Sequence, residues 1–182
     1  MAARESNRLV IDASVARSAG GEEAAFPTSK RCRDFLKATL AVCHSAVLTS
    51  EVNEEWKRHR SAFARGCLVS MMARKKVHRI GSAVNDSLRS KIERVTASAK
   101  DREAMLKDFH LIEAAMATDR IVISLDKTVR RLFAVAARDV GELKSIAWVN
   151  PDQTEERPIL WLGNGAKPDK KRLLGFRAGG SR

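Results

Sequence analysis

The sequence has no tyrosine, few aromatic residues of any kind (5%) and only three cysteines in 182 residues. Cys32, Cys43 and Cys67 are odd in number and lack a paired C-x-x-C spacing, so we expect reduced thiols, no zinc site and a cytoplasmic protein. No apolar run approaches the roughly 20 residues of a transmembrane helix, and the opening stretch MAARESNR does not resemble a signal peptide. The sequence therefore argues against a membrane protein and against a disulfide-stabilised secreted domain.

Two common catalytic motifs are also missing. No G-x-S-x-G nucleophile elbow occurs, which argues against a serine hydrolase. The stretch GNGAK at residues 163–167 has the wrong spacing for a phosphate-binding P-loop and follows no predicted strand.

Positive charge, in contrast, is in excess. The chain has 34 Lys and Arg against 22 Asp and Glu, for a formal net charge of +12. Such an excess indicates a polyanionic partner, and nucleic acid is a better candidate than a membrane. Hydrophobic residues make up 44% of the chain, which is enough for a mainly aliphatic core. We expect one folded domain over residues 1–150, followed by an extension over residues 151–182.

Short apolar runs alternate with amphipathic stretches along residues 1–150. Strands are predicted at residues 9–11, 46–50, 121–124 and 145–149. Helices are predicted at residues 30–42, after 50, at 66–80 beyond a break at Gly66, and at 82–97, 101–119 and 127–137. This alternation predicts an α/β fold in three layers, with a parallel sheet of about four to five strands flanked by helices.

The predicted extension has a different composition. It is rich in Gly, Pro and charge, and carries one apolar cluster at residues 159–162. Arg157 to Arg182 contain seven Lys or Arg and one Asp. We interpret it as basic and partly ordered, with Trp161 docked on the domain, and as a segment that contacts phosphates or docks a protein partner.

Three aspartates stand where chemistry is expected. Asp12 and Asp126 come directly after predicted strands, and the carboxyl ends of parallel strands meet at the edge of the sheet where α/β proteins bind ligands. Asp108 shares a predicted helical stripe with Met105 and Ile112, where a carboxylate is costly unless it is compensated. For Asp108, the alternative is an acid at the edge of the stripe that pairs with Lys or Arg.

A fourth acid is expected from the stretch SEVNEEW at residues 50–56. Glu54 falls on the polar face, and Glu51 suits the first turn of a helix for dipole reasons alone. Glu55 lies beside Trp56 at the edge of the inward face, so we prefer Glu55 and keep Glu51 as the alternative. Converging carboxylates are tolerable where they hold Mg²⁺ or Mn²⁺, and such ions assist phosphodiester cleavage.

In order and spacing, this set resembles the PIN-domain nucleases, which include the VapC-type toxins. The resemblance is carried by VIDAS (residues 10–14), by the acid in SEVNEEW, and above all by KDFHLIEAAMATDRIVISLD (residues 107–126). It covers about residues 8–150. It implies a PIN-like fold and a ribonuclease that depends on Mg²⁺ or Mn²⁺.

The resemblance also implies roles for single residues. Its four acids fall on Asp12, Glu55, Asp108 and Asp126. Ser124 would orient a carboxylate or touch a metal-bound water, and Ser14 would support Asp12. An antitoxin or other inhibitory protein, and a second copy in a homodimer, are candidate partners. The long loop after Asp12, the large helical middle region and the basic tail depart from the small-toxin pattern, which weakens the case for a free-standing toxin.

A basic stretch from Trp56 to Arg79 has eight Lys or Arg and no acid. We predict that it binds an RNA backbone through sequence-independent, salt-sensitive contacts, although a solvated helix face would look similar. The predicted nucleic-acid contacts are Lys57, Arg58, Arg74, Lys75, Lys76 and Arg79.

The sequence is also compared with two other functions, and each makes a different demand on the acids. One is a non-catalytic RNA- or DNA-binding protein on the same fold with an incomplete acid set. The other is a receiver-like signalling domain, which needs adjacent acids after the first strand and a lysine after a late one, and the sequence does not place them.

Overall fold

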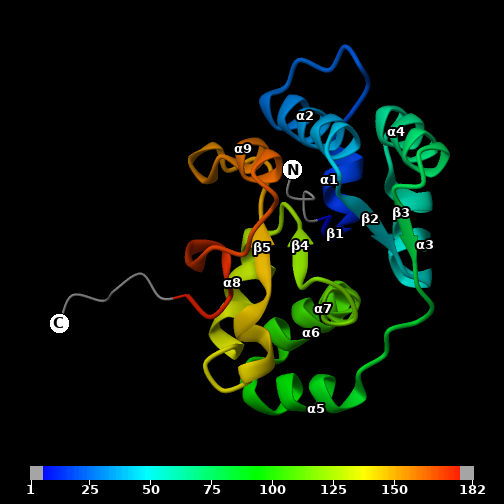
Figure 1. The fold of residues 1–182 in the computed structure, drawn as a ribbon. Helices are drawn as coiled ribbons and strands as arrows, with labels where there is room; N and C mark the ends of the chain where they lie inside the picture. Colours follow the sequence, from blue (N-terminus) through cyan, green and yellow to red (C-terminus); the bar gives the residue numbers. More distant parts are fainter. Residues whose placement is uncertain (1–5, 177–182) are drawn as a thin grey trace.

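The computed structural model describes residues 6–176, which form an α/β fold around a five-stranded, all-parallel sheet (Figure 1). The strand order is β3-β2-β1-β4-β5. The strands are β1 (Arg8–Ile11), β2 (Ser45–Leu48), β3 (Val77–Arg79), β4 (Ile121–Ile123) and β5 (Ala147–Val149). The predicted parallel sheet flanked by helices is therefore confirmed.

Helices cover both faces of the sheet. One layer contains α1, α2, α4 and α9, and the other contains α5, α6, α7 and α8 (Figure 1). The chain moves one way from β1 to β3 and the other way from β4 to β5, and right-handed crossovers then place the helices on opposite faces. The helices are α1 (Ala13–Ser18), α2 (Pro27–Ala41), α3 (Ser50–His59), α4 (Ala62–Ala73), α5 (Asp86–Val95), α6 (Ala99–Lys107), α7 (Phe109–Met116), α8 (Lys127–Ala136) and α9 (Pro158–Gly163), with 3-10 turns η1 (Gly141–Ser145), η2 (Thr154–Glu156) and η3 (Lys170–Arg172).

The central strands are buried on both faces. Leu9, Val10 and Ile11 in β1 are at most 1% exposed, and so are the three residues of β4. A strand covered by helices on both sides needs apolar residues at every position, which is why these strands are continuous apolar runs rather than alternating ones.

Strand β3 was not predicted, because residues 66–80 were assigned to one helix. The structure ends α4 at Ala73, where Lys75 takes a left-handed backbone (φ 56°) and the Lys76 amide donates to the Met71 carbonyl at 2.8 Å. This is the Schellman pattern of a helix end, usually formed by glycine. The polar strand VHR then pairs with β2 at the edge of the sheet.

Two other helix boundaries also differ from the sequence prediction. The break expected at Gly66 lies instead at Arg60 and Ser61, and the Ser61 hydroxyl caps α4 by accepting from the Ala64 amide. The stretch after Asp12, expected to be a loop, begins with the short helix α1. Its helical residues are mostly small or β-branched, so composition gave little signal for a helix.

The extension contributes ordered structure up to Phe176. Helix α9 packs on α2, with Trp161 only 7% exposed, and Leu173 forms an antiparallel bridge to Ala147 of β5. The buried His44 ring accepts from the Asn7 amide at 3.0 Å through Nδ1, so its Nε2–H donates to the Leu162 carbonyl at 3.1 Å. Burial lowers the pKa of His44, which keeps the ring neutral and this arrangement intact.

Lys75→Gly should raise the free energy of unfolding by about 1 kcal/mol, because glycine adopts the left-handed backbone without a Cβ penalty. Lys75→Ala keeps the Cβ while removing the same charge, so it should give no such gain. Urea denaturation of the three proteins measures the difference. Equal stability of the Gly and Ala variants would contradict this account of how α4 ends.

Candidate active site

The carboxyl ends of β1 and β4 lie side by side where the strand order reverses. The Asp12 amide donates to the Ile123 carbonyl at 2.9 Å, and the Ser124 amide donates to the Val149 carbonyl at 3.0 Å. Crevices at such switch points are the usual ligand sites of open α/β sheets. The sheet therefore brings Asp12 to Ser124 and Asp126, although more than 100 residues separate Asp12 from the other two in the sequence.

Two hydroxyl groups hold the Asp12 carboxylate. Asp12 Oδ2 accepts from the hydroxyl of Ser14 and from that of Ser124, the latter at 2.8 Å. The same hydroxyl oxygens accept backbone amides of the facing loop, Ser124 from Asp126 at 3.1 Å and Ser14 from Leu125 at 3.2 Å. Asp12 Oδ1 accepts no hydrogen bond from residues 6–176, so one oxygen is oriented and unused.

Asp126 has a structural role as well as a candidate chemical one. It is the N-cap of α8, where its Oδ1 accepts from the Val129 amide at 2.8 Å. A carboxylate at this position satisfies an orphan amide and interacts favourably with the helix dipole. Its second oxygen accepts no hydrogen bond within the described part of the chain, and is available to a ligand.

Asp108 lies at a helix break rather than on a continuous helix. Residues 101–119 were predicted as one helix, but α6 ends at Lys107 and α7 begins at Phe109, with Asp108 between them (φ −100°, ψ 9°). The stripe assigned to it was therefore wrong. No Gly or Pro marks this break, and α6 and α7 each have an apolar face. The hydrophobic pattern therefore gives no sign that the helix is interrupted at Asp108.

Asp108 interacts electrostatically with the other two aspartates. The pKa of Asp108 is raised to about 6, mainly by burial and then by the negative charges of Asp12 and Asp126, while His110 and Lys107 oppose the shift. None of these three aspartates forms an ion pair within residues 6–176. We call Asp12, Asp108 and Asp126 the aspartate trio.

Both candidates for the fourth acid lie on α3. The helix is tied to the trio's edge of the sheet, because Trp56 Nε1 donates to the Ile11 carbonyl at 2.7 Å. A cavity of about 370 Å³ is lined by Ser50, Glu51, Glu54, Glu55, Arg58 and His110.

The three glutamates of this cavity have different neighbours. Glu54 is paired with Lys57 at 2.7 Å, and Glu55 faces His59 at 3.6 Å. The pKa of Glu51 is lowered mainly by a hydrogen bond from its own backbone, with smaller effects of Thr49, Ser82 and His110. His110 thus interacts with both Glu51 and Asp108, which links this cavity to the trio.

The predicted basic contacts fall into different settings. Arg58 lines the cavity beside the glutamates, and Arg74, Lys75 and Arg79 are exposed. Lys57 is engaged by Glu54, as above. The Lys76 ammonium donates to the carbonyls of Leu40 (2.8 Å) and Val42 at the end of α2, where a cation also complements the helix dipole. Lys76 therefore has a structural role of its own.

Sequence reasoning missed two buried polar residues, of which Asn150 lies next to the site. Asn150, 2% exposed at the end of β5, donates to the Leu125 carbonyl at 3.2 Å and accepts from the Asp152 amide at 2.8 Å, so it holds the loop before Asp126. Its position directly after a strand was the same signal that identified Asp12. Glu113 is 7% exposed and accepts from the Asn85 amide at 2.8 Å, which fixes the start of α5.

The donors fit a hard divalent cation in kind. Mg²⁺ and Mn²⁺ prefer carboxylate oxygens, and the trio offers oxygens that accept no other hydrogen bond. As the side chains stand, residues 6–176 contain no group of three or more His, Cys, Asp or Glu arranged closely enough to hold a metal ion. A cation would have to draw the carboxylates together.

The sequence matches no known protein-family model, and a search of curated proteins gives no match. In the described part of the chain, no helix combines the length and the apolar character needed to cross a membrane.

Asp108→Asn should stabilise the metal-free protein at pH 7 by about 1 kcal/mol, after allowance for solvent screening. The raised pKa means that the folded state binds the Asp108 proton more tightly than the unfolded state, so stability falls as pH rises from about 4 to 6. The gain should therefore vanish below about pH 4. Urea denaturation of the wild type and the variant, with chelator present to remove metal ions, measures this difference in stability from about pH 4 to pH 7. A stability gain that does not change with pH would contradict the prediction.

Proposed function

We propose that the protein is a metal-dependent endoribonuclease with a PIN-like fold. The observation that supports this best is the aspartate trio, in which Asp12 and Asp126 follow the two strands at the switch point without ion-pair partners, and burial together with their charges raises the pKa of Asp108. Such an arrangement destabilises a protein unless a ligand compensates it. The order and spacing of the acids, which resemble those of PIN-domain nucleases, point to the same function.

In this proposal the trio holds Mg²⁺ or Mn²⁺, with Glu55 or Glu51 completing the acid set. The bound cation would neutralise the scissile phosphate and activate water for its hydrolysis. Ser14 and Ser124 keep one oxygen of Asp12 fixed, so that the other is directed to the ligand. Asp108 must lose its proton to bind a cation, so metal affinity should weaken below about pH 6.

Basic side chains supply the attraction for RNA. Arg58 lies beside the acidic cavity, where a phosphate approaching the trio would meet it. The exposed Arg74, Lys75 and Arg79 add sequence-independent attraction from β3 and the end of α4. An antitoxin or other inhibitory protein, and a homodimer, stay predictions that rest on the resemblance.

A non-catalytic RNA- or DNA-binding protein is the second candidate. The specific observation in its favour is that no set of three ligands within residues 6–176 is already arranged for a metal ion. In that case the trio would be an acidic feature beside a nucleic-acid surface, and binding would not require a cation.

Asp12→Asn, Asp108→Asn and Asp126→Asn should each lower RNA cleavage in Mg²⁺ or Mn²⁺ by about 100-fold or more, because each removes a ligand charge. Asparagine keeps the size of each side chain and can still cap α8 at residue 126. The exposed Asp139, changed to Asn, is the matched control and should leave the rate unchanged. Cleavage of mixed RNAs is followed on gels, with chelator as a blank.

Ser124→Ala should give a smaller loss, about 10- to 100-fold, because Asp12 is then less well oriented. If all three aspartate variants cut RNA at the wild-type rate, the assigned site is wrong. RNA binding without cleavage in any metal would favour the second candidate.

Glu55→Gln should reduce the cleavage rate by about tenfold or more, and Glu54→Gln should not, because Glu54 is exposed and already paired with Lys57. Glu51→Gln is measured beside them, because Glu51 shares His110 with Asp108. A loss in Glu51→Gln together with full activity in Glu55→Gln would move the fourth acid one helical turn toward β2.

A further inference from the structure

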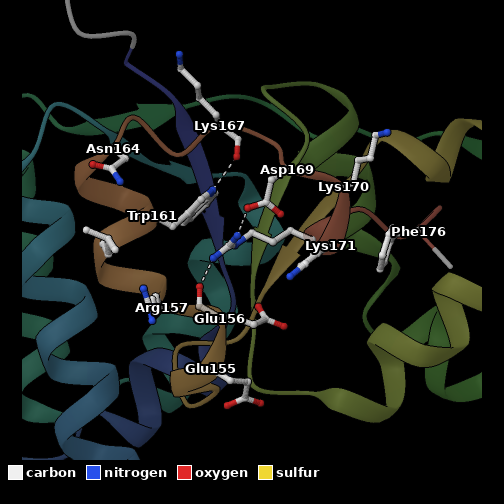
Figure 2. Close-up of a pocket in the computed structure, with 12 residues that line it drawn as sticks. Glu155, Glu156, Arg157, Trp161, Asn164, Lys167, Asp169, Lys170, Lys171 and Phe176 are labelled. Atoms are coloured by element: carbon white, nitrogen blue, oxygen red, sulfur yellow. Dashed lines mark hydrogen bonds and ion pairs between the residues drawn. The ribbon is translucent and has the colours of Figure 1, made fainter. Parts of the chain in front are cut away.

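A second cavity, of about 1110 Å³, lies outside the aspartate trio. Figure 2 shows α9 with Trp161 and Arg157 on one side of it, and the terminal segment with Lys170, Lys171 and Phe176 on the other. We call it the extension groove, because residues 155–176 line it.

The floor of the extension groove is a fixed network. The Arg172 guanidinium lies 5.3 Å from the centre of the Trp161 ring and donates to Asp169 and to the Glu156 carbonyl. Trp161 Nε1 donates to the Lys167 carbonyl at 2.8 Å. These contacts hold α9 and η3 in one arrangement and neutralise the Asp169 charge, so the groove is pre-formed.

The rim is cationic. Arg157, Lys167, Lys170 and Lys171 are exposed, and none of their charged groups has a hydrogen-bond or ion-pair partner among residues 6–176. Glu156 is engaged by Arg130 at 2.6 Å, which leaves the exposed Glu155 as the acid of the lining without a basic partner in the described residues. The groove therefore suits a polyanion.

Exposed apolar surface lies between these cations. Leu160 is 55% and Phe176 is 41% exposed. Cations beside an exposed aromatic face are what single-stranded nucleic acid needs, since phosphates meet the charges while bases stack. An amphipathic peptide helix would need apolar anchors at several successive turns, and this lining offers two large exposed apolar side chains.

One end of the extension groove, at Glu156, is tied to α8, the helix that Asp126 caps. Glu156 forms an ion pair with Arg130, and the Arg130 amide donates to the Asp126 carbonyl at 3.1 Å, so Arg130 follows Asp126 by about one turn of α8, a rise of about 6 Å. The other end of the groove lies toward the amino ends of the strands, because Leu173 bridges Ala147 and the Leu174 amide donates to the Ile146 carbonyl at 2.9 Å. The groove therefore leads away from the trio along β5.

We propose that the extension groove binds a single-stranded stretch of the RNA substrate that flanks the cleavage site. Lys170 and Lys171 contact its phosphates, together with Arg157 and Lys167, and Phe176 stacks on a base. The RNA is a substrate only if the proposed ribonuclease function holds. The assignment of RNA binding depends on the groove alone.

The test measures binding of a fluorescein-labelled single-stranded RNA of about 20 nucleotides by anisotropy, in chelator and over a salt series. Lys170→Glu with Lys171→Glu should weaken binding tenfold or more, and should lower the logarithmic salt slope by about 1.4, or about 0.7 for each phosphate contact. The matched control, Arg94→Glu with Lys100→Glu, makes the same charge change on exposed sites of α5 and α6, far from α9 (Figure 1). It should change affinity much less.

Two further variants separate charge from stacking. Phe176→Ala should weaken binding about tenfold and leave the salt slope unchanged, because the variant loses a stacking contact with a base but keeps every phosphate contact. Arg157 has a left-handed backbone (φ 46°), so Arg157→Gly relieves strain while removing a cation. It should melt no lower than wild type, yet bind RNA more weakly with a reduced slope.

Cleavage distinguishes failure of this inference from failure of the proposed function. An RNA of about four nucleotides is too short to occupy both the trio and the groove, so the groove variants should cut it at the wild-type rate. The same variants should cut a long RNA at low concentration more slowly than the wild type does. Unchanged affinity and slope for the long RNA in the groove variants would overturn the groove while leaving a working nuclease. Wild-type protein that cuts no RNA would overturn the proposed function, and the binding data would still decide the groove. If the groove variants bind a poly-glutamate peptide more weakly than the wild type does but bind RNA equally well, the groove is a peptide site and the inference is wrong.

Discussion

The Asp12 amide donates to the Ile123 carbonyl, and this hydrogen bond joins the carboxyl ends of β1 and β4, the point at which the strand order reverses. The candidate site depends on that junction. Ser14 and Ser124 cross it to hold Asp12, and Asp126 begins α8 directly behind it. Each of these hydroxyl oxygens also accepts a hydrogen bond from a backbone amide of the loop before α8. The orientation of the Asp12 carboxylate therefore depends on the position of that loop.

The site conflicts with the stability of the protein that carries it. Asp108 is partly buried and interacts with the like charges of Asp12 and Asp126, and both effects raise its pKa, so folding disfavours its charged form. The fold can retain the trio because its position is set elsewhere, by the buried β1 and β4 strands and the large apolar core between the helix layers. A cation would relieve the repulsion, so in the proposed function the acidic trio and the net charge of +12 would act on two different partners, a metal ion and a polyanion.

How much could be predicted from the sequence differs between residues for physical reasons. Asp12 and Asp126 were placed correctly at the edge of the sheet because continuous apolar runs identify buried parallel strands, and their ends follow directly. The break at Asp108 was missed because tertiary packing stops α6 there without Gly or Pro. Strand β3 was missed because it has only three residues, two of them polar, at the sheet edge, and because a lysine occupies the left-handed position where glycine would have signalled the end of α4.

The extension does more than add charge. Leu173 bridges Ala147 and covers part of the open edge of β5, while the other edge is the short polar strand β3, so both edges are protected from pairing with another chain. On the same segment, Arg172 ties η3 to Trp161 and Glu156, and Glu156 ties the segment to Arg130 on α8. Edge protection and the cationic groove thus share one set of contacts. Loss of Arg172 would release both at once, which is why the exposed Lys170 and Lys171 are the informative positions for RNA binding and Arg172 is not.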